Sequence, residues 1–305
     1  WGASLGGVHR RTAPKQRIDS TSSTVLVQGL AVLEALARIP HGSHFSPQEL
    51  SIIAWSTAVC DRYNIAVPVA LRNVLLSLAP APRPLGAYSS TALVNLVWAF
   101  AHFLQGESEL GTPVVSLIEE ELVRRGLGAL QPHQLSNLLW ALSKTGYADA
   151  LAFPAASRLL LGEPSDVEHG TAGMTLRELS EQSLAMTLWA FATVDRASPP
   201  LLSAMEAELL DRGLGEFHDA EINAAIFAFS KTKHGNTAPI WDAIDEEAAR
   251  RAQNHLGAGA GERTREGAGL QAAAARRGAS WESAELGSLG ADYHQPSGLE
   301  QIDDY

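Results

Sequence analysis

A repeated helical pattern constrains this chain more than any other feature. Five segments superpose on one another, and in each an apolar anchor residue is followed five residues later by an aromatic residue. The segments are FSPQELSIIAWSTAV (45–59), YSSTALVNLVWAFAH (88–102), LQPHQLSNLLWALSK (130–144), LSEQSLAMTLWAFAT (179–193) and FHDAEINAAIFAFSK (217–231). The anchor aromatics, as we name these aromatic residues, are Trp55, Trp98, Trp140, Trp189 and Phe227. They lie 43, 42, 49 and 38 residues apart, and a period of this size is typical of a solenoid.

Each repeat carries the signals of two helices. The first helix begins at a capping residue, most clearly where Ser46 is followed by Pro47 and Glu49. The predicted first helices cover 46–61, 89–104, 131–146, 180–195 and 218–233. The second helix is predicted to begin at a proline, and these prolines are Pro68, Pro113, Pro154, Pro200 and Pro239. Gly126 and Gly213 follow two of the second helices, where a left-handed C-cap is expected.

The repeats predict an all-α protein, a right-handed α-solenoid of tandem helix–turn–helix repeats over residues 24–252. Within this domain, 24–39 is predicted to be the second helix of a truncated leading repeat, and 162–179 an insertion that lengthens one spacing. Residues 1–23 form a basic, Ser/Thr-rich tail, which is either the remnant of an organellar transit segment or a disordered terminus. Residues 253–305 are of low complexity without periodicity, and we expect a disordered tail there.

The first helices have two apolar surfaces with a narrow polar stripe beside them. The anchor aromatic lies about 140° around the helix from the anchor leucine. We therefore interpret the anchor aromatics as structural wedges between neighbouring repeats. The stripe lies two and nine residues after the anchor leucine, and its polar members are Asn95, His102, Asn137, Lys144, Thr193 and Lys231. Amide and cationic side chains in register suit unstacked bases and phosphates, and a solvated edge of the array is the competing interpretation.

Composition limits the partners that this chain can have. The net charge is −11, which counts against promiscuous binding of nucleic acid, and the first and second helices each sum to −3. The acidic clusters at 119–121 and 245–247 are expected to be solvated outer faces. No apolar stretch reaches the roughly 18 residues of a membrane span, so none is expected.

No catalytic constellation is found in the sequence. The GxSxG, GxxxxGK[ST] and HExxH motifs are absent. His41 and His44 lack further ligands at metal spacing, and Cys60 is the only cysteine, which we expect to be a small core residue. We therefore expect no enzyme, no metal, no cofactor and no small-molecule substrate.

The repeats resemble a known family. The strings SPQEL…W, LSNLLWALSKTGY and LAMTLWAFAT are similar to the octotricopeptide repeats of algal organelle proteins. They are also similar to the leucine-rich region of the FAST kinase-like proteins and to the heptatricopeptide repeats of alveolates. The resemblance covers about residues 24–252, and its most specific part is LSNLLWALSK at 135–144.

The resemblance implies an α-solenoid that binds single-stranded RNA, an organellar transcript or ribosomal RNA. It implies a place in the mitochondrial matrix, or alternatively the chloroplast stroma, and a role in RNA processing, mRNA stability or translation. Several relatives end in a RAP domain, but 253–305 has no counterpart of it, so RNA cleavage is not carried over. The alternative is a protein–protein scaffold or a structural subunit of an organellar ribonucleoprotein, with ribonucleoprotein proteins as its partners.

Overall fold

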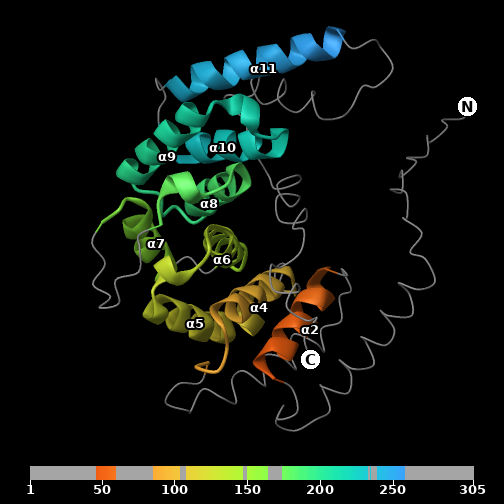
Figure 1. Ribbon diagram of the computed structural model, residues 1–305, viewed down its shortest axis with the longest axis vertical. Helices are drawn as coiled ribbons and strands as arrows, with labels where there is room; N and C mark the ends of the chain where they lie inside the picture. Colours follow the sequence, from red (N-terminus) through yellow and green to blue (C-terminus); the bar gives the residue numbers. More distant parts are fainter. Residues whose placement is uncertain are drawn as a thin grey trace, which may run out of the picture.

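The computed structural model describes residues 46–59, 85–103, 108–146, 150–163, 174–232, 234 and 239–257, and every regular element in these ranges is helical (Figure 1). The first helices are α2 (Pro47–Val59), α4 (Ser90–Phe103), α6 (Pro132–Lys144), α8 (Glu181–Thr193) and α10 (Asp219–Thr232). The second helices are α5 (Ser108–Arg125), α7 (Ala152–Leu160), α9 (Pro199–Arg212) and α11 (Pro239–Gly257). The predicted all-α class and the helical repeats are confirmed.

Several predictions fall outside the described residues. These are the tail at 1–23, the leading helix at 24–39, the second helix at Pro68, and the tail at 253–305 beyond Gly257. His41, His44 and Cys60 also lie outside them.

The first helices begin where their capping residues predict. The Ser46 backbone N–H donates to the Glu49 carboxylate at 2.6 Å, and the Glu49 N–H donates to the Ser46 hydroxyl at 3.3 Å. These two bonds form the predicted capping box, and the hydrogen bonds from Ser46 lower the pKa of Glu49. The hydroxyls of Ser89 and Ser180 accept the N–H groups three residues later, at 3.1 and 3.2 Å.

Consecutive first helices pack against one another, from α2 through α4, α6 and α8 to α10. The second helices α5, α7 and α9 lie along the other side of this row (Figure 1). The residue after each of the last four anchor aromatics is an alanine that is completely buried, and these are Ala99, Ala141, Ala190 and Ala228. A residue this small lets neighbouring helices approach closely. The next position holds a large buried residue, as at Phe191, whose ring meets Phe153 of α7 edge-on at 5.2 Å.

The second helices depart from the sequence prediction at two points. α5 begins at Ser108, so Pro113 lies inside the helix rather than at its start. The other described prolines do lie in the first turn of their helices. Gly126 and Gly213 have positive φ angles of 90° and 76°, as expected. Their ψ angles of 122° and 134° are extended, so neither adopts the left-handed helical conformation that we predicted.

The insertion predicted at 162–179 is shorter than expected. Leu176–Glu178 forms a 3₁₀ turn directly before α8, and equivalent turns at Leu127–Ala129 and Leu214–Glu216 precede α6 and α10. Leu176 is buried like its counterparts in the other two turns. This turn is therefore a regular part of the repeat, and the added residues lie before it.

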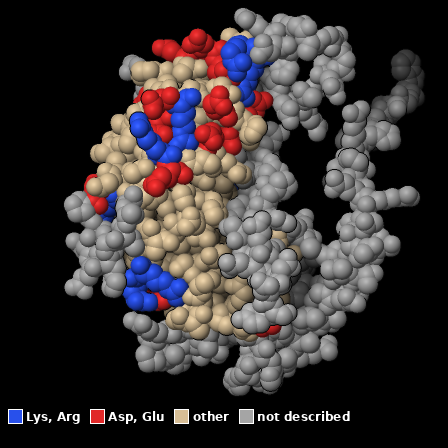
Figure 2. All heavy atoms as spheres, in the orientation of Figure 1, with Lys and Arg blue, Asp and Glu red and all other residues tan. Residues whose placement is uncertain are grey.

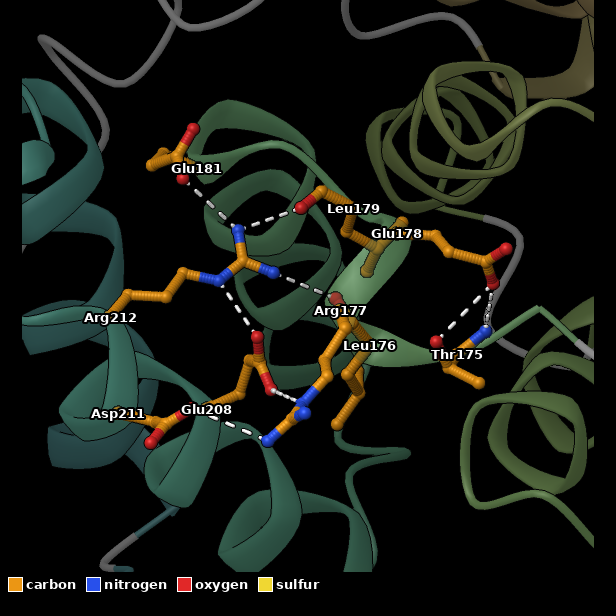
Figure 3. Close-up of polar contacts among 9 residues, drawn as sticks. All are labelled: Thr175, Leu176, Arg177, Glu178, Leu179, Glu181, Glu208, Asp211 and Arg212. Atoms are coloured by element: carbon orange, nitrogen blue, oxygen red, sulfur yellow. Dashed lines mark hydrogen bonds and ion pairs between the residues drawn. The ribbon is translucent and has the colours of Figure 1, made fainter.

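An arginine closes the helical hairpin of the fourth repeat (Figure 3). The Arg212 guanidinium, at the end of α9, donates to the Leu179 carbonyl at 2.7 Å and to the Leu176 carbonyl at 2.9 Å. Its Nε also donates to Oε1 of Glu208, one turn earlier on α9, at 2.8 Å. Because Leu176 and Leu179 precede α8, the arginine ties the end of the second helix to the start of the first. We name this arrangement the arginine clamp.

The arginine clamp recurs in the second and fifth repeats. Glu121 and Arg125 have the same spacing as Glu208 and Arg212, and so do Glu247 and Arg251. Arg125 and Arg251 donate to the carbonyls of Leu85, Tyr88, Leu214 and Phe217. The clamps therefore use arginine at equivalent positions for a purpose that only its planar, five-donor fork serves well.

The clamps overturn part of the prediction that the clusters at 119–121 and 245–247 are solvated. Glu121 and Glu247 are buried beneath the clamp arginines. Hydrogen bonds from the arginines three and four residues later on the same helix lower the pKa of both carboxyls.

Glu119 is buried for another reason. Its side chain is only 1% exposed, and it accepts the Ala152 N–H at 2.7 Å, at the start of α7. Burial raises the pKa of Glu119 to about 7, against the opposing effect of this hydrogen bond. The carboxyl thus joins the second helix of one repeat to the second helix of the next.

Candidate ligand-binding row

The polar stripe divides into two levels. At the level two residues after the anchor leucine, Asn95 is half-buried, but Asn137 is only 3% exposed, and Met186 and Ala224 are buried. Helix packing therefore leaves Asn137 little surface for a ligand. The second level lies in the last turn of each first helix, four residues after the anchor aromatic. Its members are His102, Lys144, Thr193 and Lys231, which we name the lysine row.

The anchor aromatics lie between neighbouring first helices. The Trp98 and Trp140 rings are stacked with their centroids 6.4 Å apart, joining α4 to α6. Trp189 and Phe227 are 6.1 Å apart and join α8 to α10. The three tryptophans here are buried, whereas Trp55 and Phe227 are half-buried. These contacts make the rings part of the packing between repeats rather than a surface on which bases stack.

Two members of the lysine row, His102 and Lys144, contact these rings. The centroid of the His102 ring lies 3.9 Å from that of Trp98 and 5.3 Å from that of Trp140. The Lys144 ammonium lies 5.8 Å from the Trp140 ring centroid and 5.0 Å from that of Trp189. A cation at this range is attracted to the face of an indole ring, so Lys144 bridges two repeats. Partial burial of the ammonium group against these rings lowers the pKa of Lys144.

The structure brings Thr193 and Lys231 together. The Lys231 ammonium donates to the backbone carbonyl of Thr193 at 2.7 Å. The Thr193 hydroxyl donates in turn to the Trp189 carbonyl, at 2.8 Å, and is half-buried. Lys144 and Lys231 are exposed, and they are the two lysines among the described residues.

Asp195 is a site residue that the sequence prediction missed. Its carboxylate lies 3.6 Å from the Lys231 ammonium, and its side chain is 75% exposed. Asp195 follows the anchor aromatic of its repeat by six residues, the position held by Gly146 in the preceding repeat. The signal available in the sequence was this replacement of a helix-terminal glycine by an acidic residue.

The described arginines on α5, α9 and α11 are engaged elsewhere. Arg124, Arg125, Arg212, Arg250 and Arg251 all pair with carboxylates. Figure 2 shows charged side chains gathered over α9 to α11 and at the end of α5, with a largely uncharged band between them. Clamp arginines therefore contribute little free positive charge, and the lysine row carries cations that are not committed to the clamps.

An acidic cavity lies at the start of α8 and α10. It has a volume of about 400 Å³, and Glu181, Glu216, Glu221 and His218 are among its lining residues. Glu221 accepts the His218 N–H at 2.7 Å, and burial raises the pKa of its carboxyl. Of these carboxylates, Glu181 already pairs with the Arg212 guanidinium at 3.2 Å, and Glu216 has no such partner among the described residues.

The described part of the chain holds no cluster of three or more histidine, cysteine or acidic side chains arranged to bind a metal. Its helices include none with the length and apolarity needed to cross a membrane. Searches against protein-family models and against curated proteins find no match to this chain.

Proposed function

We propose that this chain is a non-catalytic RNA-binding protein, a right-handed α-solenoid of tandem helix–turn–helix repeats. Its ligand is single-stranded RNA, an organellar transcript or ribosomal RNA. It acts in the mitochondrial matrix, or alternatively in the chloroplast stroma, in RNA processing, mRNA stability or translation. The helical repeats and their resemblance to octotricopeptide and FAST kinase-like repeats support the proposal. Because α-solenoids stack similar units, a strand lying along equivalent helix ends meets each unit in the same way.

The observation that carries the proposal is the position of the lysines. Lys144 and Lys231 occupy equivalent positions in the last turns of α6 and α10, two repeats apart. An ammonium group is a compact charge that suits phosphate, whereas the guanidinium groups of the clamps bind carboxylates and carbonyls. His102 on α4 and Thr193 on α8 complete the row.

Few phosphates can be neutralised by such a row. Lys231 already pairs with Asp195 at 3.6 Å, so Lys144 is the expected phosphate contact. The dependence of log affinity on log salt should then have a slope of about −0.7, the contribution of one single-strand phosphate contact. The overall charge of −11 opposes binding of any polyanion without further contacts. RNA recognition here must therefore rest on hydrogen bonds to bases as well as on charge.

Filter binding to a pool of random single-stranded 12-mer RNAs tests the proposal. The double variant Lys144→Gln/Lys231→Gln should bind about tenfold more weakly, with a salt slope smaller by about 0.7. Arg158→Gln/Arg177→Gln is the matched control, because it removes the same charge from exposed side chains outside the row. Equal losses in the two double variants, or no binding by the wild type, would refute the proposal.

A second candidate is a protein–protein scaffold or a structural subunit of an organellar ribonucleoprotein. The acidic cavity at Glu181, Glu216 and Glu221 favours it, because that cavity suits a basic partner. Crosslinking in native extract separates the two functions. RNA crosslinks on the last turns of α4, α6, α8 and α10 support direct RNA binding, and crosslinks to protein alone support the scaffold.

A further inference from the structure

Asp195 has an unusual backbone conformation for its residue type. Its φ angle is 56°, and it is the one non-glycine residue with positive φ in the described ranges. The Arg196 N–H donates to the Phe191 carbonyl at 3.0 Å, so Asp195 occupies the terminal position of α8 that glycine usually takes. Gly146, its equivalent after α6, has a φ of 70°. Aspartate tolerates this conformation less well than glycine, and the preceding repeat uses the better residue.

The contacts of Asp195 do not stabilise the fold enough to explain why an aspartate occupies this position. Its partner is Lys231, and an exposed ion pair at 3.6 Å contributes little to folding. The Lys231 ammonium is already held by the Thr193 carbonyl at 2.7 Å. The carboxylate therefore stands at the surface, beside a cation whose position is fixed by another contact.

This pair presents a defined hydrogen-bonding pattern. A carboxylate accepts two parallel hydrogen bonds, and an ammonium group has three donors, of which the Thr193 carbonyl takes one. Such a pair complements a ligand edge that carries two adjacent N–H donors beside one acceptor. Among the four RNA bases, only guanine has this edge, formed by N1–H, the N2 amino group and O6. A phosphate group fits less well, because the carboxylate repels it.

We propose that Asp195 and Lys231 form a base-edge site that selects an unstacked guanine. Asp195 accepts from N1–H and the N2 amino group, and Lys231 donates to O6. This inference rests on the proposed function, because it assigns the base preference of the lysine row between the fourth and fifth repeats. Asp195 then has two effects, since it weakens non-selective binding of phosphate and adds selectivity for one base.

A pool of RNA decamers randomised at every position tests the site. Sequencing of the fraction bound to the wild type should show guanine enriched at one position by about tenfold, the scale of one bidentate base contact. The variant Asp195→Asn should lose this enrichment, because an amide offers only one acceptor oxygen. Asp211→Asn, which removes another exposed carboxylate with an arginine partner, should retain it. Inosine in place of guanosine in the most enriched decamer should weaken wild-type binding about tenfold.

The outcomes separate this inference from the proposed function. If the wild type binds the pool without guanine enrichment, or if Asp195→Asn keeps the enrichment, the guanine site is wrong while RNA binding stands. If the wild type binds no RNA, both are wrong. Asp195→Gly guards against misfolding as an explanation, because glycine relieves the backbone and should raise the thermal midpoint while guanine selectivity is lost.

Discussion

Replacing the largely buried Arg212 by alanine should destabilise the fourth repeat more than replacing the exposed Arg177 nearby. The arginine side chain is 14% exposed and its partner Glu208 is 11% exposed, so both are largely removed from water. The variant leaves the Glu208 carboxylate without its partner at 2.8 Å and the carbonyls of Leu176 and Leu179 without their donor (Figure 3).

The magnitude follows from these contacts. Removing one member of a buried ion pair costs about 3–5 kcal/mol, because the other charge stays behind. Each unsatisfied buried carbonyl adds about 1–3 kcal/mol where water cannot reach it. Two effects reduce the sum, since water can enter at this edge and the guanidinium of Arg177 lies 3.9 Å from Glu208. We therefore expect a loss of about 3 kcal/mol in the free energy of unfolding.

Urea unfolding followed by circular dichroism measures this loss, and hydrogen exchange of α8 amides locates it. Arg177→Ala is the matched control, because Arg177 is 77% exposed and pairs with the exposed Asp211 at 3.4 Å. An exposed pair contributes less than about 1 kcal/mol. If the two variants differ by less than about 0.5 kcal/mol, the clamp does not stabilise the repeat and this reasoning fails. Arg212→Lys should fall between them, because lysine keeps the charge and loses the fork.

Three further predictions concern single positions. Gly213→Ala should cost about 1–2 kcal/mol in urea unfolding because its φ is 76°, although a Cβ there meets nothing within 4 Å, whereas Gly215→Ala should be nearly neutral. Trp140→Ala should cost about 4 kcal/mol in the same assay, and a small effect would mean that the ring is not a packing element. Burial raises the folded-state pKa of Glu119 from 4.5 to about 7, so the folded chain holds this proton more tightly than the unfolded chain. Its stabilisation is complete below about pH 4.5 and is lost as pH rises through about 7, so urea midpoints should fall over that range in the wild type relative to Glu119→Gln.

The sequence was sufficient to place the first helices, because two independent signals agree there. The capping residues mark their starts, and the anchor aromatic followed by alanine marks the face that meets the next helix. The predicted ranges, such as 131–146 and 180–195, exceed α6 and α8 by one or two residues at each end. The starts of the second helices are harder to predict, because a proline is the only signal in the sequence that marks them. Pro113 lies inside α5, where it removes one hydrogen bond and its ring crowds the carbonyl four residues earlier, so a proline alone does not mark the start of this helix.

The lysine row and the clamps could be predicted only in part. Spacing alone put Asn137 and Lys144 on one stripe, but it could not tell that neighbouring helices cover the first and leave the second exposed. The sequence alone predicts that Glu121 and Glu247 are solvated. It does not reveal their burial, because the carbonyls that accept from their arginine partners lie in turns distant in the sequence. A glutamate with an arginine four residues later recurs in α5, α9 and α11, and this spacing is the sequence signal for the clamps.

The two kinds of cation in this protein have different surroundings, and the difference bears on how an acidic chain would bind the proposed anionic ligand. A guanidinium that already holds a carboxylate and two carbonyls has its charge and donors satisfied, so the clamps stabilise hairpins without making a basic surface. The Lys144 ammonium lies over a ring face, and that of Lys231 donates to one carbonyl beside Asp195, so both keep donors for a ligand. Because the lysine row and the clamps lie on different helices, the proposed ligand would meet the row without contacting the clamps. If a ligand were instead bound through the clamp arginines, its binding would have to open the hairpins, and hydrogen exchange of the α8 amides would then increase on binding.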